Sequence, residues 1–115
     1  MMVLKEGAKV HVISRRLFEN DLRRHFVGEV QAAGEVAVRI EGYVFVFDAG
    51  NGRYVKRPER RVRIFGLADS GNIINVIPAH VDLEALSYQT SADNRTVFTD
   101  GMSFTLDTNE FSAVR

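Results

Sequence analysis

Apolar and polar residues alternate along most of the chain, and this period of two is typical of half-buried β-strands. The longest such run covers residues 36–47. Its first face is β-branched and consists of Val36, Val38, Ile40, Val44 and Val46. Its second face is polar at first and then aromatic, at Tyr43, Phe45 and Phe47. Because a glycine inside a strand often marks a bulge or bend, the pattern predicts a long strand that bends near Gly42.

Shorter runs with the same period flank the long strand and predict its neighbours. These strands are expected at residues 10–13, 26–30, 61–64 and 73–77, with a further strand beginning at Arg53. The Asn51-Gly52 pair predicts a tight hairpin turn after the long strand, because both residue types tolerate positive φ angles. Pro58 has no N–H to donate, so we expect the strand that begins at Arg53 to be interrupted at Pro58 or to lie on an edge there.

Two segments leave alternatives open. Phe18, Leu22 and Phe26 recur at steps of four residues, so residues 15–24 fit either a short helix or an irregular loop. The apolar positions of residues 80–86 fit either a helical turn or a strand.

The Asp100-Gly101 pair predicts a hairpin near the C-terminus. A two-residue loop pairs Thr99 with Met102, and Val97 with Phe104. This register would place the apolar residues of the hairpin on one face, where contacts between side chains of opposite strands would stabilise the hairpin.

About seven to nine short strands, separated by turn residues roughly every 8–12 positions, indicate an all-β barrel or sandwich. The bent strand favours a small barrel of the SH3-like, Sm-like or OB type, with at most one or two short helical turns. The length of 115 residues is that of one domain, so we expect a single β-barrel domain over residues 1–115. The C-terminal hairpin would close this barrel, cap it or serve for assembly.

The composition removes several classes of protein. The chain has no cysteine, which excludes disulfides, iron–sulfur clusters and thiolate zinc sites. Its longest apolar stretch, near residues 43–47, is far shorter than the roughly 20 residues of a membrane helix. Lys5 and Glu6 follow the first four residues at once, which leaves no apolar region for a secretory signal. We therefore expect a cytoplasmic protein without a membrane partner.

The net charge is zero, yet the two halves of the chain differ in charge. Residues 1–65 contain 13 Lys and Arg against 8 Asp and Glu, whereas residues 66–115 contain 2 against 7. Positive charge is densest in residues 53–63, where Glu59 is the only acid. The candidate binding residues of this basic segment are Arg53, Tyr54, Lys56, Arg57, Arg60, Arg61 and Arg63. They could meet phosphates or an acidic protein, or pair with acidic residues of the same chain or a second copy.

The sequence carries no recognisable catalytic pattern. His11, His25 and His80 have no partner at the spacing of metal ligands. There is no G-x-S-x-G nucleophile elbow, and Gly50-Asn51-Gly52 lacks the third glycine and the helix of a phosphate-binding loop. We therefore expect no catalytic residue, no metal site and no cofactor, unless the three histidines converge in the folded chain.

Three hypotheses for the function follow. The leading one is a non-catalytic binding or assembly module that forms a homo-oligomer, because its oppositely charged halves attract each other between copies and small barrels pair their edge strands. The second is a module for RNA or single-stranded DNA, in which Tyr54, or Tyr43 and Phe45, would stack on bases beside the arginines. The third is an enzyme or small-ligand protein with a site built from dispersed histidines and acids.

Overall fold

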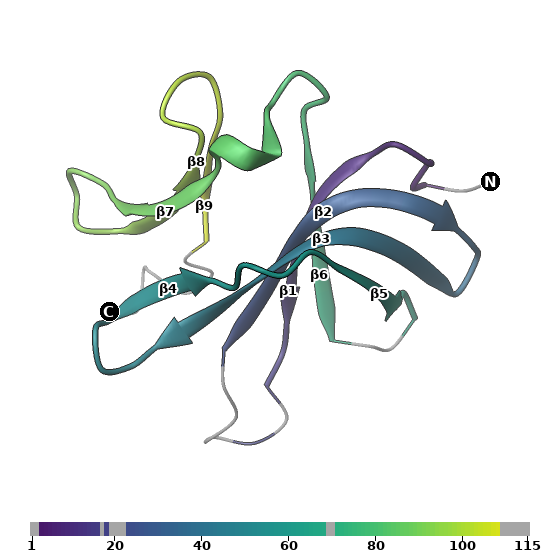
Figure 1. The fold of residues 1–115 in the computed structure, drawn as a ribbon, viewed down its shortest axis with the longest axis horizontal. Helices are drawn as coiled ribbons and strands as arrows, with labels where there is room; N and C mark the ends of the chain where they lie inside the picture. The colour runs from purple at the N-terminus through teal and green to yellow at the C-terminus, as the bar shows by residue number, and fades with distance from the viewer. Residues whose placement is uncertain (1–2, 17, 19–22, 69–70, 109–115) are drawn as a thin grey trace. The chain divides into compact units, whose positions relative to one another are not determined.

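The computed structural model describes residues 3–16, 18, 23–68 and 71–108, and this part of the chain is all-β (Figure 1). It contains nine short antiparallel strands in two sheets and one 3₁₀ turn. The chain divides into two compact units, Met1–Ala79 and His80–Arg115. The single domain expected from the sequence stays a prediction.

The first unit contains β1 (Lys9–Ser14), β2 (Arg24–Ala33), β3 (Ala37–Asp48), β4 (Arg53–Lys56), β5 (Arg61–Gly66) and β6 (Asn72–Ile77). The second unit contains the 3₁₀ turn η1 (Leu83–Ala85), β7 (Ser87–Thr90), β8 (Thr96–Thr99) and β9 (Thr105–Asp107). The strands that alternation predicts in the first unit are confirmed.

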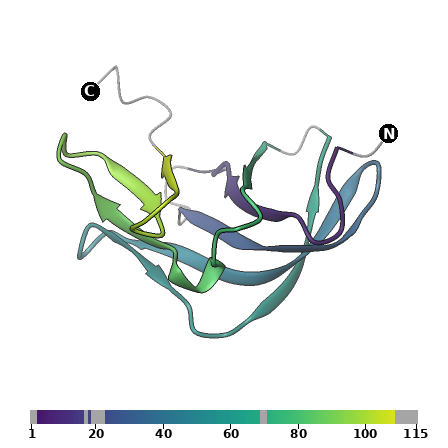
Figure 2. The same cartoon turned by 90° about the horizontal axis from the view of Figure 1, so that it is seen from above.

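The sheet of the first unit is built around β2 and β3, which run side by side (Figures 1 and 2). Its strand order is β4-β3-β2-β1-β6, and β5 pairs with β3. The first half of β3 pairs with β5 and its last four residues pair with β4, so both short strands share one edge of β3. Pro58 lies between β4 and β5, where an interruption was predicted. In the part of the chain that the structure describes, β5 and β6 do not pair and no closed barrel forms.

Two glycines oppose each other in this sheet, Gly28 on β2 and Gly42 on β3, whereas the register of the two strands shifts further along, between Val30 and Ala32. A Cβ atom on Gly42 would lie 1.8 Å from the carbonyl oxygen of Val27. A Cβ atom on Gly28 would lie 2.2 Å from the carbonyl oxygen of Glu41. Only glycine permits backbones to approach so closely, and at Gly42 the partner of β3 changes from β5 towards β4. This close approach explains why position 42 holds a glycine, while the bend predicted near Gly42 stays a prediction.

Alternation divides the first sheet into two faces. The inner face contains the main hydrophobic core, which consists of Leu4, Val10, Val12, Phe26, Val30, Val38, Ile40 and Val44. The outer face contains the residues between them, including His11, His25 and Phe45, which are also buried. Of the β-branched face predicted for the long strand, Val38, Ile40, Val44 and Val46 lie on the inner face, and the aromatic residues lie on the outer face. Val36 was assigned to this face wrongly, because it precedes β3 and is exposed.

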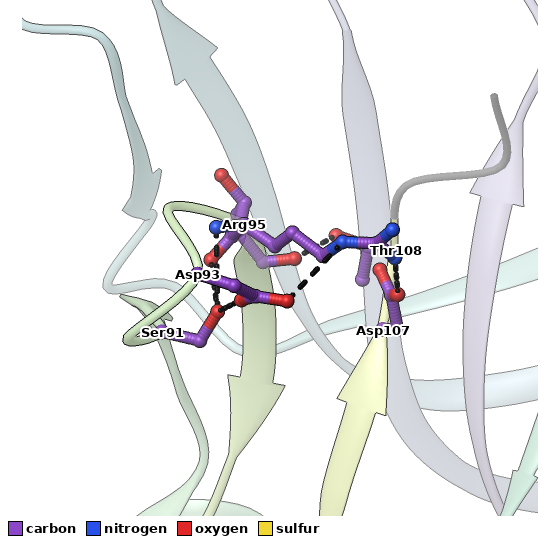
Figure 3. A network of polar contacts seen from close by, with 6 residues as sticks. Ser91, Asp93, Arg95, Asp107 and Thr108 are labelled. Atoms are coloured by element: carbon purple, nitrogen blue, oxygen red, sulfur yellow. Dashed lines mark hydrogen bonds and ion pairs between the residues drawn. The ribbon is translucent and has the colours of Figure 1, made fainter. Parts of the chain in front are cut away.

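The second unit is a three-stranded antiparallel sheet with β8 in the centre. Phe98 is fully buried, and its ring lies 4.6 Å from the ring of Tyr88. Figure 3 shows a network of polar contacts around Arg95, whose guanidinium lies 2.7 Å from Asp107 and 3.4 Å from Asp93. Ser91 donates a hydrogen bond to Asp93, so the network ties the β7–β8 turn to β9.

The predicted register of the C-terminal hairpin is wrong. Thr99 pairs with Thr105 instead of Met102, and Val97 pairs with Asp107 instead of Phe104. The reason is Asp100, whose Oδ1 accepts hydrogen bonds from the backbone N–H groups of Met102, Ser103 and Phe104. This carboxylate stabilises a five-residue loop over residues 100–104, which displaces the pairing by three positions.

The two open segments have different outcomes. Residues 80–86 contain the turn η1, with Asp82 as its N-cap, and not a strand. The helix or loop expected at residues 15–24 lies in large part outside the described residues. The structure has no helix, among the residues it describes, that is long and apolar enough to span a membrane.

Candidate functional site

The basic segment of residues 53–63 is divided between the two faces of the first sheet. Arg61 lies opposite Gly42 and Arg63 opposite Ile40, so both belong to the inner face. Tyr54, opposite Phe47, belongs to the outer face. Of the candidate residues, Lys56 and Arg60 lie with Tyr54 on the outer side, whereas Arg53 lies opposite Asp48 on the inner side. The seven residues therefore do not form one continuous surface.

Three of the candidate arginines meet at a pocket of about 560 Å³ on the inner face. The pocket is lined by Arg24, Val44, Val46, Phe47, Asp48, Val55, Arg57, Arg61 and Arg63. Arg24 begins β2 and is not among the binding residues that the sequence predicts. Its position could have been predicted from the sequence pattern, because Arg24 is two residues before Phe26 and so shares the core-facing side of that strand. The structure leaves Arg53, Tyr54, Lys56 and Arg60 outside the pocket lining.

The strand register explains how the pocket combines charged and apolar residues. On the inner face, Val46 lies between Arg24 of β2 and Val55 of β4. The backbone N–H of Arg57 donates to the carbonyl oxygen of Val44 at 2.9 Å, which continues the β4 edge by one row. The pocket therefore combines valines of β3 and β4 with arginines that come from β2 on one side of β3 and from β5 and the end of β4 on the other.

The pocket has an excess of positive charge, with four arginines and one acid among its lining residues. The acid, Asp48, accepts hydrogen bonds from Gly50 N at 3.0 Å and Asn51 Nδ2 at 2.7 Å in the following turn. Arg61 lies 3.2 Å from Glu59, and this hydrogen bond lowers the pKa of the Glu59 carboxyl.

The other three arginines of the pocket, Arg24, Arg57 and Arg63, form no ion pair with a carboxylate of the described residues. A cluster of guanidinium groups without carboxylate partners is an electrostatic site for anions. The arrangement can therefore hold a negatively charged group by charge and by hydrogen bonds.

The aromatic residues expected to stack on bases lie on the opposite face from the pocket. Tyr43 is covered by Lys56, whose Nζ lies 4.1 Å from the ring centre, and by Arg60 at 5.4 Å. Arg60 also pairs with Glu41 at 3.3 Å. Phe45 is buried, at 4% exposure. These rings therefore do not form a stacking platform beside Arg61 and Arg63.

Two of the three histidines come together on the outer face of the first sheet. The rings of His11 and His25 are 5.0 Å apart, and the ring of Tyr54 stacks on His25 at 4.6 Å. Tyr54 OH lies 3.4 Å from His25 Nε2, and Asn75 Nδ2 lies 3.4 Å from His11 Nδ1. Burial lowers the pKa of His11 to about 3, with a further contribution from the neighbouring His25.

Burial also lowers the pKa of His25 to about 4, and the charge of Arg23 acts in the same direction. Both imidazoles are therefore neutral at pH 7. Across the described residues, no group of three or more His, Asp or Glu side chains is placed to hold a metal ion.

The third histidine, His80, belongs to the second unit and lies close to a serine. His80 Nε2 is 3.1 Å from Ser103 Oγ, a separation that also occurs between a catalytic base and its nucleophile. However, Ser103 Oγ donates to Asp100 Oδ2 at 3.1 Å, and the nearby backbone N–H groups donate to Asp100 Oδ1. Since Asp100 occupies the donors that an oxyanion would need, this contact is better explained as loop structure.

No protein-family model, curated protein or solved structure matches the chain.

Proposed function

We propose that the protein is a binding module that holds an anionic ligand in the four-arginine pocket of its first unit. The observation that carries this proposal is the meeting of Arg24, Arg57 and Arg63 beside apolar side chains, where none of the three forms an ion pair with a carboxylate of the described residues. Holding several guanidinium groups near each other costs electrostatic energy, and a bound anion would offset this cost.

The test is a titration of the full-length protein with pyrophosphate, a compact multivalent anion, followed by amide NMR. We expect saturable shifts at the amides of Val44, Val46 and Val55. Arg57→Gln removes one charged hydrogen-bond donor, which is worth about 1.5–3 kcal/mol, and should weaken binding by about 10-fold or more. The matched control is Arg39→Gln, an exposed residue of β3 whose neighbours in the strand, Val38 and Ile40, face the core.

Equal weakening by both substitutions would contradict the proposal, because it would mean that anions respond only to total charge. Amide NMR shifts that do not saturate with pyrophosphate, or that occur outside the first unit, would also contradict the proposal.

A second candidate function is self-association, which the leading hypothesis from the sequence included and which we now propose to occur along the edge strand β5. The observation in its favour is that Val62 and Ile64, on the outer face of this strand, are 53% and 71% exposed. Against it, Arg61 and Arg63 point inward on the same strand, and inward-pointing charges are one way in which proteins discourage pairing between edge strands.

Light scattering after gel filtration tests this second candidate. A dimer or larger oligomer that Ile64→Lys dissociates would support it. The control is Val3→Lys, which changes another exposed apolar residue outside the strands. A wild-type protein that is monomeric at every concentration would exclude it.

The type of barrel also stays a proposal. Two features support an opened form of a small SH3-like, Sm-like or OB-type barrel. One is the close approach of β2 and β3 at Gly28 and Gly42. The other is the contact of Asn72 Nδ2 with the carbonyl oxygen of Gly66 at 3.2 Å, which links the ends of β5 and β6.

A further inference from the structure

The pocket has features beyond its charge that restrict the ligand. Val55 is 42% exposed although it lies on the inner face beside Val46, which packs against the core. A hydrated inorganic anion bound to the arginines would leave this valine in contact with water. A ligand with an apolar part would cover it and gain the free energy of removing apolar surface from water.

The number of guanidinium groups restricts the charge of the ligand. Four arginines and Asp48 line the pocket, and Glu59 pairs with Arg61 and also feels the charge of Arg57, so these six groups carry a net charge of +2. A monoanion would leave half of this charge uncompensated. A phosphate monoester carries about two negative charges at neutral pH and three acceptor oxygens, which match the fork of donors on arginine.

The size of the pocket and the positions of the aromatic rings restrict the ligand further. A volume of about 560 Å³ lies in the usual range for small-molecule sites, about 300–1,000 Å³. Single-stranded nucleic acid is usually held by bases stacked on aromatic side chains. Tyr43 and Tyr54 are on the outer face, where other side chains cover them. Phe47 lines the pocket, but its ring already contacts Tyr54 at 5.2 Å and Arg23 at 5.3 Å, so the pocket favours a small molecule over a strand.

We infer that the ligand is a small organic phosphate, namely a phosphate monoester whose organic part is apolar. The phosphate binds Arg57, Arg63 and Arg24, and the organic part covers Val55 and Val46. This inference rests on the proposed function, because it assigns a ligand class to the same pocket.

The experiment is calorimetric titration of the full-length protein with phenyl phosphate and with methyl phosphate, which share the charged group and differ in apolar area. We expect phenyl phosphate to bind about 10-fold more tightly. Phenyl sulfate, which has the same ring and a single charge, should bind about 10-fold more weakly than phenyl phosphate.

Two pairs of variants separate the charged and apolar contributions. Val55→Thr keeps the shape of the side chain and should reduce the preference for phenyl over methyl phosphate by several-fold. Val62→Thr, at an exposed outer-face position, is its control and should leave the preference unchanged. Arg63→Gln should weaken both phosphates by a similar factor of about 10, whereas Arg39→Gln should not.

The possible failures are distinguishable. If phenyl and methyl phosphate bind equally well and Arg63→Gln weakens both, the inference is wrong and the proposed function stands. If neither phosphate binds, and pyrophosphate causes no saturable shift, both are wrong. If an oligo-dT of roughly 12 nucleotides binds more tightly than phenyl phosphate, with a salt dependence that indicates several phosphate contacts, a nucleic-acid strand replaces the small molecule as ligand.

Discussion

Gly42 illustrates how a single residue determines the geometry of the first sheet. Gly42→Ala would place a methyl group 1.8 Å from the Val27 carbonyl oxygen and 2.6 Å from the Gly28 Cα atom. Both contacts are with backbone, so the clash requires the strands to separate. We expect the substitution to lower the free energy of unfolding by about 2–4 kcal/mol, as measured by urea denaturation.

Gly50→Ala is the matched control for this prediction. Its added Cβ would have only the flexible side chain of Asp48 nearby, at 3.3 Å, and the loss should be below about 1 kcal/mol. Equal losses for the two substitutions would mean that the opposed glycines do not constrain the sheet.

The buried histidine pair makes stability depend on pH. His11 and His25 have folded-state pKa values of about 3 and about 4, below the ordinary value of 6.5, chiefly because of burial. The unfolded chain therefore binds more protons between about pH 4 and 6.5, and stability falls as the pH is lowered through this range. Between about pH 7 and pH 5, we expect a loss of about 2 kcal/mol for each histidine in urea titrations.

Substitution at one member of the pair checks the origin of this effect. His25→Gln should reduce the loss between pH 7 and 5 by about half, because one of two titrating groups is removed. His80→Gln, an exposed residue of the second unit, should leave it unchanged. A pH dependence that is the same in all three proteins would refute the role of the pair.

Among the elements, the β8–β9 hairpin depends on one carboxylate in its loop. Asp100 Oδ1 accepts hydrogen bonds from three successive backbone N–H groups, and the N–H of Met102 contributes most to lowering the pKa of this carboxyl. Asp100→Ala removes this acceptor. We expect amide exchange at Ser103 and Phe104 to accelerate by roughly 10-fold or more, because local opening no longer breaks these bonds.

Asp100→Asn retains a side-chain oxygen and should preserve most of the protection at the same amides. Pairing of Thr99 with Met102 in the Asp100→Ala variant, seen as cross-strand NMR contacts, would show that Asp100 sets the register. Unchanged exchange rates in both variants would contradict this account.

The sequence could predict where strands occur but not how their ends pair. Alternation located the strands of the first unit, because burial of one sheet face repeats every second residue. The sequence did not predict the five-residue loop at Asp100, because an Asp-Gly pair also fits a two-residue turn. The length of the loop depends on hydrogen bonds that form only in the folded chain. β7 was missed because residues 87–90 contain a single apolar side chain, Tyr88.

The sequence predicted only some residues of the candidate site, because the pairing of strands decides which residues meet there. The dense basic segment pointed to Arg57, Arg61 and Arg63, and the structure brings these three together. Arg24 could be added only by combining its position on β2 with the pairing of β2 and β3. Side chains alternate between the two faces of the sheet, so Arg63 lies in the pocket while Lys56 and Arg60 lie on the outer face. A run of charged residues in the sequence therefore does not form one charged surface.

At the scale of the whole molecule, the zero net charge conceals two oppositely charged units. Residues 1–79 contain 13 Lys and Arg against 9 Asp and Glu, and residues 80–115 contain 2 against 6. Salt screens the interaction between exposed charges beyond one Debye length, about 10 Å at 0.1 M salt. A charged column matrix is therefore attracted by the nearest charged groups of the protein rather than by its net charge. At neutral pH and low salt, we therefore expect the protein to bind both to a cation exchanger and to an anion exchanger, despite a pI of about 6.8.

The four-arginine pocket should carry a large share of the binding to the cation exchanger. The double variant Arg57→Gln, Arg63→Gln is expected to elute from a sulfonate column at a lower salt concentration than wild type. Arg53→Gln, Arg39→Gln removes the same charge outside the pocket lining and should shift elution less, because clustered guanidinium groups produce the higher local potential. If both double variants shift elution equally, net charge explains the binding and the pocket adds nothing to it. If wild type passes through both columns, the charges of each unit are compensated locally, and the electrostatic basis of the proposed anion site is lost with them.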